Sequence, residues 1–284
     1  MTSTSEARVS ILALPRPNDR EVLLAFVVTL IVAAFSPSSI PGSYSASWLV
    51  VFKERTGAVE LLAITVMALL VFRFRREDLL SRSDLVTVAA ASLAFVLPFR
   101  FAVGLPLTAA GFKLAFHRDP RVNSVGQILL ALAFYEWLGP TLFHILCPLT
   151  LKFETLAVQG ILAPLGGFTR NGLTIVGSSH HHITVDAGCS AFHNLSVSTL
   201  IWIALLKLDT LTIKSAHYWI LVAMAGATIA LNTVRIALMA QSKEMFNYWH
   251  DGAGIPILKI TMLAVILGIC VSGLRLVESC RCAE

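Results

Sequence analysis

The sequence predicts an all-α multi-pass membrane protein with about eight transmembrane helices and a small extracytoplasmic β-hairpin. The first observation is composition: 56% of the 284 residues are hydrophobic and 14% are charged, with a mean hydropathy of +0.76. Soluble domains contain about 45–50% apolar and about 25% charged residues. The second observation is that the apolar residues gather in long runs. The third is that Lys and Arg gather in alternate connecting segments, which is typical of membrane proteins.

The apolar runs define the expected spans, because about 20 apolar residues are needed to cross a bilayer as a helix. These spans are 22–34, 58–72, 85–97, 101–116, 126–147, 191–206, 218–239 and 255–274. The first four are short or interrupted. Pro98 and Arg100 separate the third from the fourth, so we expect that pair to form a tight hairpin surrounded by protein.

The positions of Lys and Arg predict the orientation. A cytoplasmic N-terminus places most of the 22 basic residues in cytoplasmic segments, and the arginines between Arg73 and Arg82 contribute most. The expected organisation is a cytoplasmic tail (1–21), an anchor span with its outer loop (22–56), a membrane core (57–275) and a second cytoplasmic tail (276–284). The first span is expected to stay in the protein as an anchor, because no clear cleavage site follows it. The net charge of +5 reflects this asymmetry rather than nucleic-acid binding.

The longest non-cytoplasmic segment, 150–188, is predicted to have two parts. Residues 153–165 form an apolar helix at the membrane interface. Residues 171–185 form a β-hairpin, because β-formers flank the small residues of the turn at 177–179. Those β-formers are Leu173, Ile175, Ile183 and Val185.

Cys189 follows this hairpin, at the expected start of the sixth span, and Ser190 comes directly after it. A helix N-terminus stabilises a thiolate through its dipole and its free backbone N–H groups. The same N–H groups are suited to binding an oxyanion. The alternative is a small buried thiol that serves only for packing.

Arg235 lies near the outer end of the seventh span, and Asn232 shares its helix face because the two residues are three apart. An arginine near hydrocarbon is costly unless it is paired or reaches water. It suits stabilisation of an oxyanion or binding of a substrate carboxylate. The alternative is an arginine that only extends to the interface.

His250 lies in the connection before the last span, next to Asp251, whose role is either to orient the histidine or only to solvate the loop. Histidine has the pKa needed to take a proton from a thiol and give one to a leaving amine. The alternative is a solvent-exposed loop histidine. His193, four residues after Cys189, is a rival base because it shares that helix face. Together the thiol, guanidinium and imidazole are expected at one membrane face, as acyl transfer requires.

These residues also carry a resemblance to a known family. Cys189-Ser190 after a hairpin, Asn232-x-x-Arg235 ending a span, and His250 with Gly252 before the final span resemble the exosortase/archaeosortase family of membrane cysteine transpeptidases. The likeness covers roughly residues 60–275. The family usually has Cys-Ser-Gly where this chain has Ala191 in the third position, which bears on substrate fit rather than on the nucleophile.

The resemblance implies that Cys189 attacks a scissile carbonyl and forms a thioester, that Arg235 stabilises the oxyanion, and that His250 protonates the departing amine. It implies substrates that are exported proteins with a C-terminal sorting signal: a short motif such as Pro-Glu-Pro, a transmembrane helix and a basic cluster. It further implies a cell-membrane location, an active site on the non-cytoplasmic face, contact with membrane lipid, and no cofactor, metal or nucleic-acid partner.

Other classes of function remain as alternatives. A transporter needs polar groups along a path at mid-membrane, whereas here they gather at the outer ends. A non-catalytic assembly or sorting factor would use the same site only for binding. A CAAX-type membrane peptidase needs a Glu-Glu pair and metal-ligating histidines on helices. The histidine run at 180–182 is a poor metal site, because successive strand residues face opposite sides. Glu136, inside a span, is expected to face the protein interior or a substrate groove.

Overall fold

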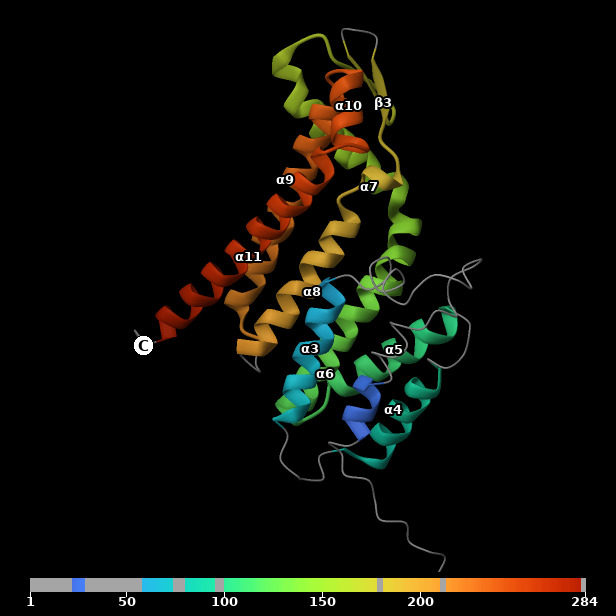
Figure 1. Cartoon of the computed structure of the whole chain (residues 1–284), viewed down its shortest axis with the longest axis vertical. Coiled ribbons are helices and arrows are strands. Elements are labelled where there is room, and N and C mark those ends of the chain that lie inside the picture. The colour runs from blue at the N-terminus through green and yellow to red at the C-terminus, as the bar shows by residue number, and fades with distance from the viewer. Residues whose placement is uncertain are drawn as a thin grey trace, which may run out of the picture.

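The computed structural model describes residues 22–28, 58–73, 80–94, 100–177, 181–209 and 213–281. Residues 22–28 are helical. The elements in chain order are α3 (Ala58–Phe72), α4 (Arg82–Ala94), α5 (Arg100–Ala115), α6 (Pro120–Ala133), the π-helix η2 (Phe134–Leu138), α7 (Gly139–Leu162), the 3-10 turn η3 (Ala163–Leu165), β1 (Thr169–Asn171), β2 (Thr174–Val176), β3 (His182–Thr184), the 3-10 turn η4 (Ala187–Cys189), α8 (Phe192–Asp209), α9 (Ser215–Met239), α10 (Lys243–His250) and α11 (Gly254–Arg281). Figure 1 labels the helices α3 to α11 and the strand β3.

Four helical stretches in the described part of the chain are long and apolar enough to cross a membrane. They are Pro120–Leu165, Ala187–Asp209, Ser215–Met239 and Gly254–Glu278. The predicted spans 126–147, 191–206, 218–239 and 255–274 lie within them, which confirms an all-helical membrane protein at that level. The remaining predicted core spans coincide with α3, α4 and α5, which have 15, 13 and 16 residues. The predicted break at Pro98 and most of the first predicted span lie outside the described residues.

The helices place two groups of connections at opposite ends of the molecule (Figure 1). The sheet, η4, α10 and the start of α11 lie at one end, which we call the sheet end. The end of α3, the start of α4 and α6, and the end of α8 lie at the other, which we call the basic end. The basic end carries Arg73, Arg121 and Lys207, residues that the sequence assigns to the cytoplasmic side.

The tight packing of α5 against α6 depends on a glycine at their crossing. A Cβ at Gly126 would lie only 2.1 Å from the backbone nitrogen of Ala115, so any larger residue there would push the two helices apart. Close approach of backbones through small residues is a common way for membrane helices to associate.

The helix predicted at 153–165 is present, but it is not a separate element. The helix α7 continues from the membrane segment through Pro148 as far as Leu162, and η3 follows it directly. Leu151, Val158 and Leu162 are buried in a second core cluster with residues of β2, β3 and α9. One face of this segment therefore packs against protein, whereas Phe153 and Leu165, each 63% exposed, lie outside that contact.

The predicted hairpin is confirmed as β2 and β3, paired antiparallel with Ile175 opposite Ile183. Both of these side chains are buried, as the alternating pattern predicted. The structure adds a third strand, β1, which pairs antiparallel with β2 through a turn at Gly172 and Leu173. Leu173 therefore lies in a turn rather than in a strand, because Gly172 adopts the positive φ of 62° that such a tight turn requires.

The connection before the last span is a helix, α10, where the sequence predicted a loop. Ser242 caps it, its hydroxyl accepting a hydrogen bond from the Met245 amide at 3.2 Å. His250 is its last residue. Gly252 permits the turn into α11, since a Cβ there would lie 2.9 Å from the Asn247 carbonyl oxygen and 3.0 Å from that of Tyr248.

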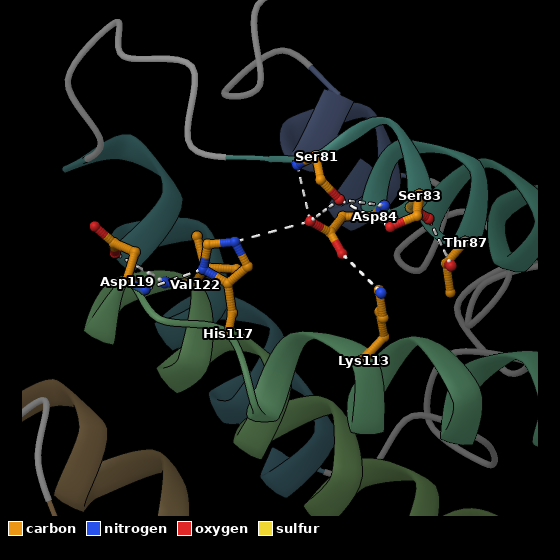
Figure 2. A network of polar contacts seen from close by, with 8 residues as sticks. All are labelled: Ser81, Ser83, Asp84, Thr87, Lys113, His117, Asp119 and Val122. Carbon is orange, nitrogen blue, oxygen red and sulfur yellow. Dashed lines mark hydrogen bonds and ion pairs between the residues drawn. The ribbon is translucent and has the colours of Figure 1, made fainter.

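A polar network at the basic end joins α4 to the connection between α5 and α6 (Figure 2). Asp84 accepts hydrogen bonds from the amide (2.8 Å) and the hydroxyl (2.6 Å) of Ser81, which caps α4. Lys113 Nζ lies 3.7 Å from its carboxylate and His117 Nε2 lies 3.8 Å from it. Asp119, two residues after His117, caps α6 because its side chain accepts hydrogen bonds from the amides of Arg121 and Val122.

This network makes part of the stability depend on pH. Burial works to raise the pKa of Asp84, but the hydrogen bonds from Ser81 and the charges of Lys113 and His117 outweigh it and lower the pKa below the ordinary 3.8. The contribution is therefore present above pH 3.8 and is lost as the pH falls through the lower folded-state pKa. We expect Asp84→Asn to cost about 1 kcal/mol at neutral pH. Thermal unfolding in detergent should show this difference shrinking in strong acid, whereas the exposed control Glu278→Gln should show no such trend.

Candidate functional site

Cys189 lies at the sheet end, as the last residue of η4, and is 5% exposed. Its backbone is held from two sides. Its amide donates to the Asp186 side-chain Oδ1 at 3.2 Å. Its carbonyl oxygen accepts a hydrogen bond from Asn232 Nδ2, on α9, at 2.7 Å. Asn232 is 1% exposed, so this bond fixes the cysteine to α9 in a region shielded from water.

Glu154, on α7, holds the residues that follow the cysteine. Its Oε1 accepts hydrogen bonds from the Ser190 hydroxyl at 2.7 Å and from the Ala191 amide at 2.9 Å. Its Oε2 is buried with no hydrogen-bond partner in the described structure. Glu154 was not singled out from the sequence, because it lies 36 residues before Ser190 and the pairing exists only in the folded chain. The one available signal was a carboxylate inside an apolar run.

The expectation that the backbone N–H groups beside Cys189 form an oxyanion hole is wrong. The Cys189 amide bonds to Asp186 and the Ser190 amide to the Ala187 carbonyl oxygen at 3.3 Å. The Ala191 amide bonds to Glu154, and the Phe192 amide bonds to the Ser190 hydroxyl at 3.2 Å. All four donors are used by the protein, because the chain makes a 3-10 turn here and α8 begins only at Phe192. Stabilisation of an oxyanion would therefore fall to side chains.

Arg235 lies next to the cysteine segment on α9. Its Nε donates to the backbone carbonyl oxygen of Trp249 at 3.1 Å. The same end of α9 thus contacts the cysteine segment through Asn232 and the residue directly before His250 through Arg235. These contacts bring the segments that carry Cys189, Arg235 and His250 to one end of the molecule.

His250 is held by its neighbours on α10. Its ring stacks on Phe246, with centroids 4.7 Å apart and planes within 13°. Its Nδ1 lies 3.0 Å from Oδ1 of Asp251, whose side chain is 75% exposed. Phe246 also contacts the edge of the His181 ring, so His181 of the histidine run belongs to this aromatic group. His182 is exposed on β3, and His180 lies outside the described residues.

A pocket of about 160 Å³ opens beside the cysteine segment. Its polar wall comes from the η4–α8 junction and α9, and its apolar wall from α11. The lining residues are Gly188, Ser190, His193, Asn194, Arg235, Ile255, Leu258, Lys259 and Met262. Arg235 thus faces a space large enough for a small polar group, and His250 is not among the lining residues.

His193 has an aromatic contact of its own. It lines the pocket, and its ring packs on that of Tyr135 with centroids 5.8 Å apart. Tyr135 is half-buried in η2. Glu136, beside it, is exposed, so it does not face the protein interior.

The hydrogen bonds that Glu154 accepts from Ser190 and Ala191 lead to a stability prediction. Glu154→Ala would leave the Ser190 hydroxyl and the Ala191 amide buried without an acceptor, at a cost of about 3 kcal/mol. Glu154→Gln keeps one carbonyl oxygen as an acceptor and should restore most of that loss. Thermal unfolding of the purified protein measures both, with Glu136→Ala as an exposed control on the same helical stretch. Equal stability of Glu154→Ala and the control would show that these contacts contribute nothing.

Comparison with protein-family models, with curated proteins and with solved structures finds no match to this chain. The resemblance to the exosortase/archaeosortase family therefore rests on the residues around Cys189, Arg235 and His250, and the function is argued from the site itself.

Proposed function

We propose that this protein is a membrane-embedded cysteine transpeptidase or protease that cleaves the C-terminal sorting signal of exported proteins. The observation that carries the proposal is that α9 contacts both neighbouring segments: Asn232 donates to the Cys189 carbonyl oxygen, and Arg235 donates to the Trp249 carbonyl oxygen, next to His250. Residues suited to act as a nucleophile, a positive charge and a base therefore lie on adjoining segments at one end of a helical membrane protein. The substrate class comes from the family resemblance alone.

The chemistry proceeds in two steps. Cys189 gives its thiol proton to a base, and its Sγ attacks the scissile carbonyl to form a tetrahedral oxyanion. The C–N bond then breaks, the protonated base gives its proton to the departing amine, and a thioester to Cys189 remains. An incoming amine or water attacks the thioester and regenerates the thiol.

Arg235 is the group proposed to stabilise the oxyanion. The four amides around Cys189 already have partners, so a side-chain donor is required there. The Nε of Arg235 is occupied by the Trp249 carbonyl oxygen, which fixes the plane of the guanidinium and leaves its terminal nitrogens for the substrate. Asn232 holds the Cys189 carbonyl oxygen, and Glu154 holds Ser190 and Ala191 directly after it, so Asn232, Ser190 and Glu154 act as positioning residues.

His250, whose Nδ1 lies 3.0 Å from Asp251, is the proposed base, and His193 is a second candidate, favoured because it lines the pocket and packs on the Tyr135 ring. We expect His250→Ala to lower kcat by about 100-fold or more. His193→Phe keeps an aromatic ring against Tyr135 and should change kcat by less than about tenfold. Rates of substrate cleavage measure both. The opposite ranking would assign the base to His193.

Transport and a purely structural sorting role are the rival functions. The pocket beside the cysteine segment lies at the sheet end, which supports an interfacial site over a transport path. Midway along α8 and α9, the buried hydroxyls of Ser198 and Thr228 hydrogen-bond to each other at 3.1 Å. A sorting factor would bind the same substrates without cutting them. A CAAX-type peptidase requires a metal ion, so EDTA would stop its activity. A thiol enzyme requires no metal ion, so its activity should continue in EDTA.

The proposal is tested with purified protein in liposomes that also contain a reporter ending in a motif, a transmembrane helix and a basic cluster. Cleavage that continues in EDTA supports the thiol enzyme. Binding of the reporter without cleavage, across several motifs, supports the sorting factor. Cleavage abolished by EDTA and restored by Zn²⁺ would replace the thiol mechanism with a metallopeptidase.

A further inference from the structure

Three basic residues from distant parts of the chain meet at the basic end. Arg73 directly follows α3, Arg121 lies in the first turn of α6, and Lys207 lies in the last turn of α8. They line one pocket of about 140 Å³, between the ends of these helices. The lining residues are Leu70, Arg73, Arg121, Lys207, Leu208 and Asp209.

Positive groups exceed negative ones in this pocket. Asp209 is the single acidic residue among the lining residues, against three basic ones. Within the described ranges, neither Arg73 nor Arg121 forms an ion pair with a carboxylate. Bringing like charges together at a helix end is unfavourable unless an anion or water offsets it.

The side chains, and not the helix ends, are the donors that a ligand would meet. The first amides of α6 are already bound by Asp119. Arg73 is exposed and Arg121 is half-buried, so both guanidinium groups reach the opening, while Lys207 is 1% exposed at the base of the pocket. Two guanidinium forks are well matched to the oxygens of a phosphate group.

The surroundings of the pocket are apolar. Phe72 is 56% exposed and Leu69 is 43% exposed on the outside of α3, and Leu208 is 38% exposed at the rim. The pocket lies where apolar helices end, which in a membrane protein is the level of the lipid headgroups. Basic pockets between helices at this level suit anionic headgroups, with acyl chains lying against the adjoining apolar surface.

We propose that this pocket is a binding site for the phosphate group of an anionic lipid, at the end of the molecule that the sequence assigns to the cytoplasm. The site is distant from Cys189 and does not depend on the proposed cleavage activity.

The test titrates the full-length protein in neutral detergent with phosphatidylglycerol, with phosphatidylcholine of the same acyl chains, and with inorganic phosphate, and counts bound molecules by native mass spectrometry. We expect phosphatidylglycerol to bind in preference to phosphatidylcholine. The double variant Arg73→Gln/Arg121→Gln should weaken its binding by about 20-fold. The matched control Arg82→Gln/Arg118→Gln removes two exposed arginines from the same end and should change it by less than about twofold.

Each other outcome would overturn the proposal. Equal binding of the two lipids would remove the role of the headgroup charge. An equal loss in the control variant would indicate general surface attraction rather than this pocket. Binding of inorganic phosphate as strong as that of phosphatidylglycerol would assign the site to a free anion. The single variants Arg73→Gln and Arg121→Gln should each weaken binding by about fivefold. Thermal unfolding of all the variants separates a loss of binding from a loss of folding.

Discussion

Replacing Cys189 by alanine is expected to abolish cleavage of a membrane-anchored substrate, with a loss of about 10⁴-fold or more. The alanine removes the only atom that forms a bond to the substrate in the proposed reaction. The fold should be retained, because the backbone of residue 189 is held through its amide and carbonyl groups by Asp186 and Asn232. The measurement is the rate of appearance of the cleaved reporter in liposomes, together with thermal unfolding of the same preparations.

Cys147 provides the matched control for this experiment. It is a free cysteine on α7 that packs against the same core cluster as Cys189. Cys147→Ala should leave the cleavage rate within about twofold, because that thiol has no role in the reaction. If Cys189→Ala folded normally and cleaved at the wild-type rate, the proposed mechanism would be wrong. If both variants lost activity together, the effect would lie in packing rather than in chemistry.

The second large effect is expected at Arg235. Arg235→Ala should lower kcat by about 10²–10³-fold, which is the range for loss of one donor to an oxyanion. Arg235→Lys should recover little, because a lysine ammonium cannot both reach the Trp249 carbonyl oxygen and present a planar pair of donors to the substrate. Steady-state kinetics separates the possible roles. A fall in kcat indicates oxyanion stabilisation, whereas a rise in KM alone would indicate binding of a substrate carboxylate.

Lys152→Ala is the control for this series, because Lys152 is an exposed basic residue on α7 outside the pocket lining. Its removal should leave both kinetic constants unchanged at moderate salt. A loss in Lys152→Ala equal to that in Arg235→Ala would show that net positive charge at the sheet end is what matters. Full activity of Arg235→Ala would exclude the arginine from the mechanism.

Features with a local cause in the sequence could be predicted. The long apolar runs correspond to the four membrane-length helices, since hydropathy over about 20 residues reports directly on burial in lipid. The pairing of Ile175 with Ile183 followed from alternation about a turn of small residues. The contact of the Cys189 segment with the end of α9 followed from topology, because both lie near span ends on the same side.

Features that depend on distant contacts could not be predicted. The acceptor for the Ser190 hydroxyl is Glu154, and only the packing of α7 against the η4–α8 junction places it there. The amides around Cys189 looked free in the sequence because nothing local showed that Asp186 and Glu154 would bind them. The helix α10 has only eight residues, too few for a clear periodic signal, so His250 was assigned to a loop.

The central claim is that Cys189 forms a thioester, and intact-protein mass spectrometry tests it most directly. The protein in detergent is incubated with a membrane-anchored substrate, quenched in acid and digested to locate any adduct. We predict an acyl adduct on Cys189 that hydroxylamine removes and that is absent in Cys189→Ala. A folded, cleaving protein whose Cys189 stays unmodified in rapidly quenched samples, while Cys189→Ala cleaves at the same rate, would contradict the account.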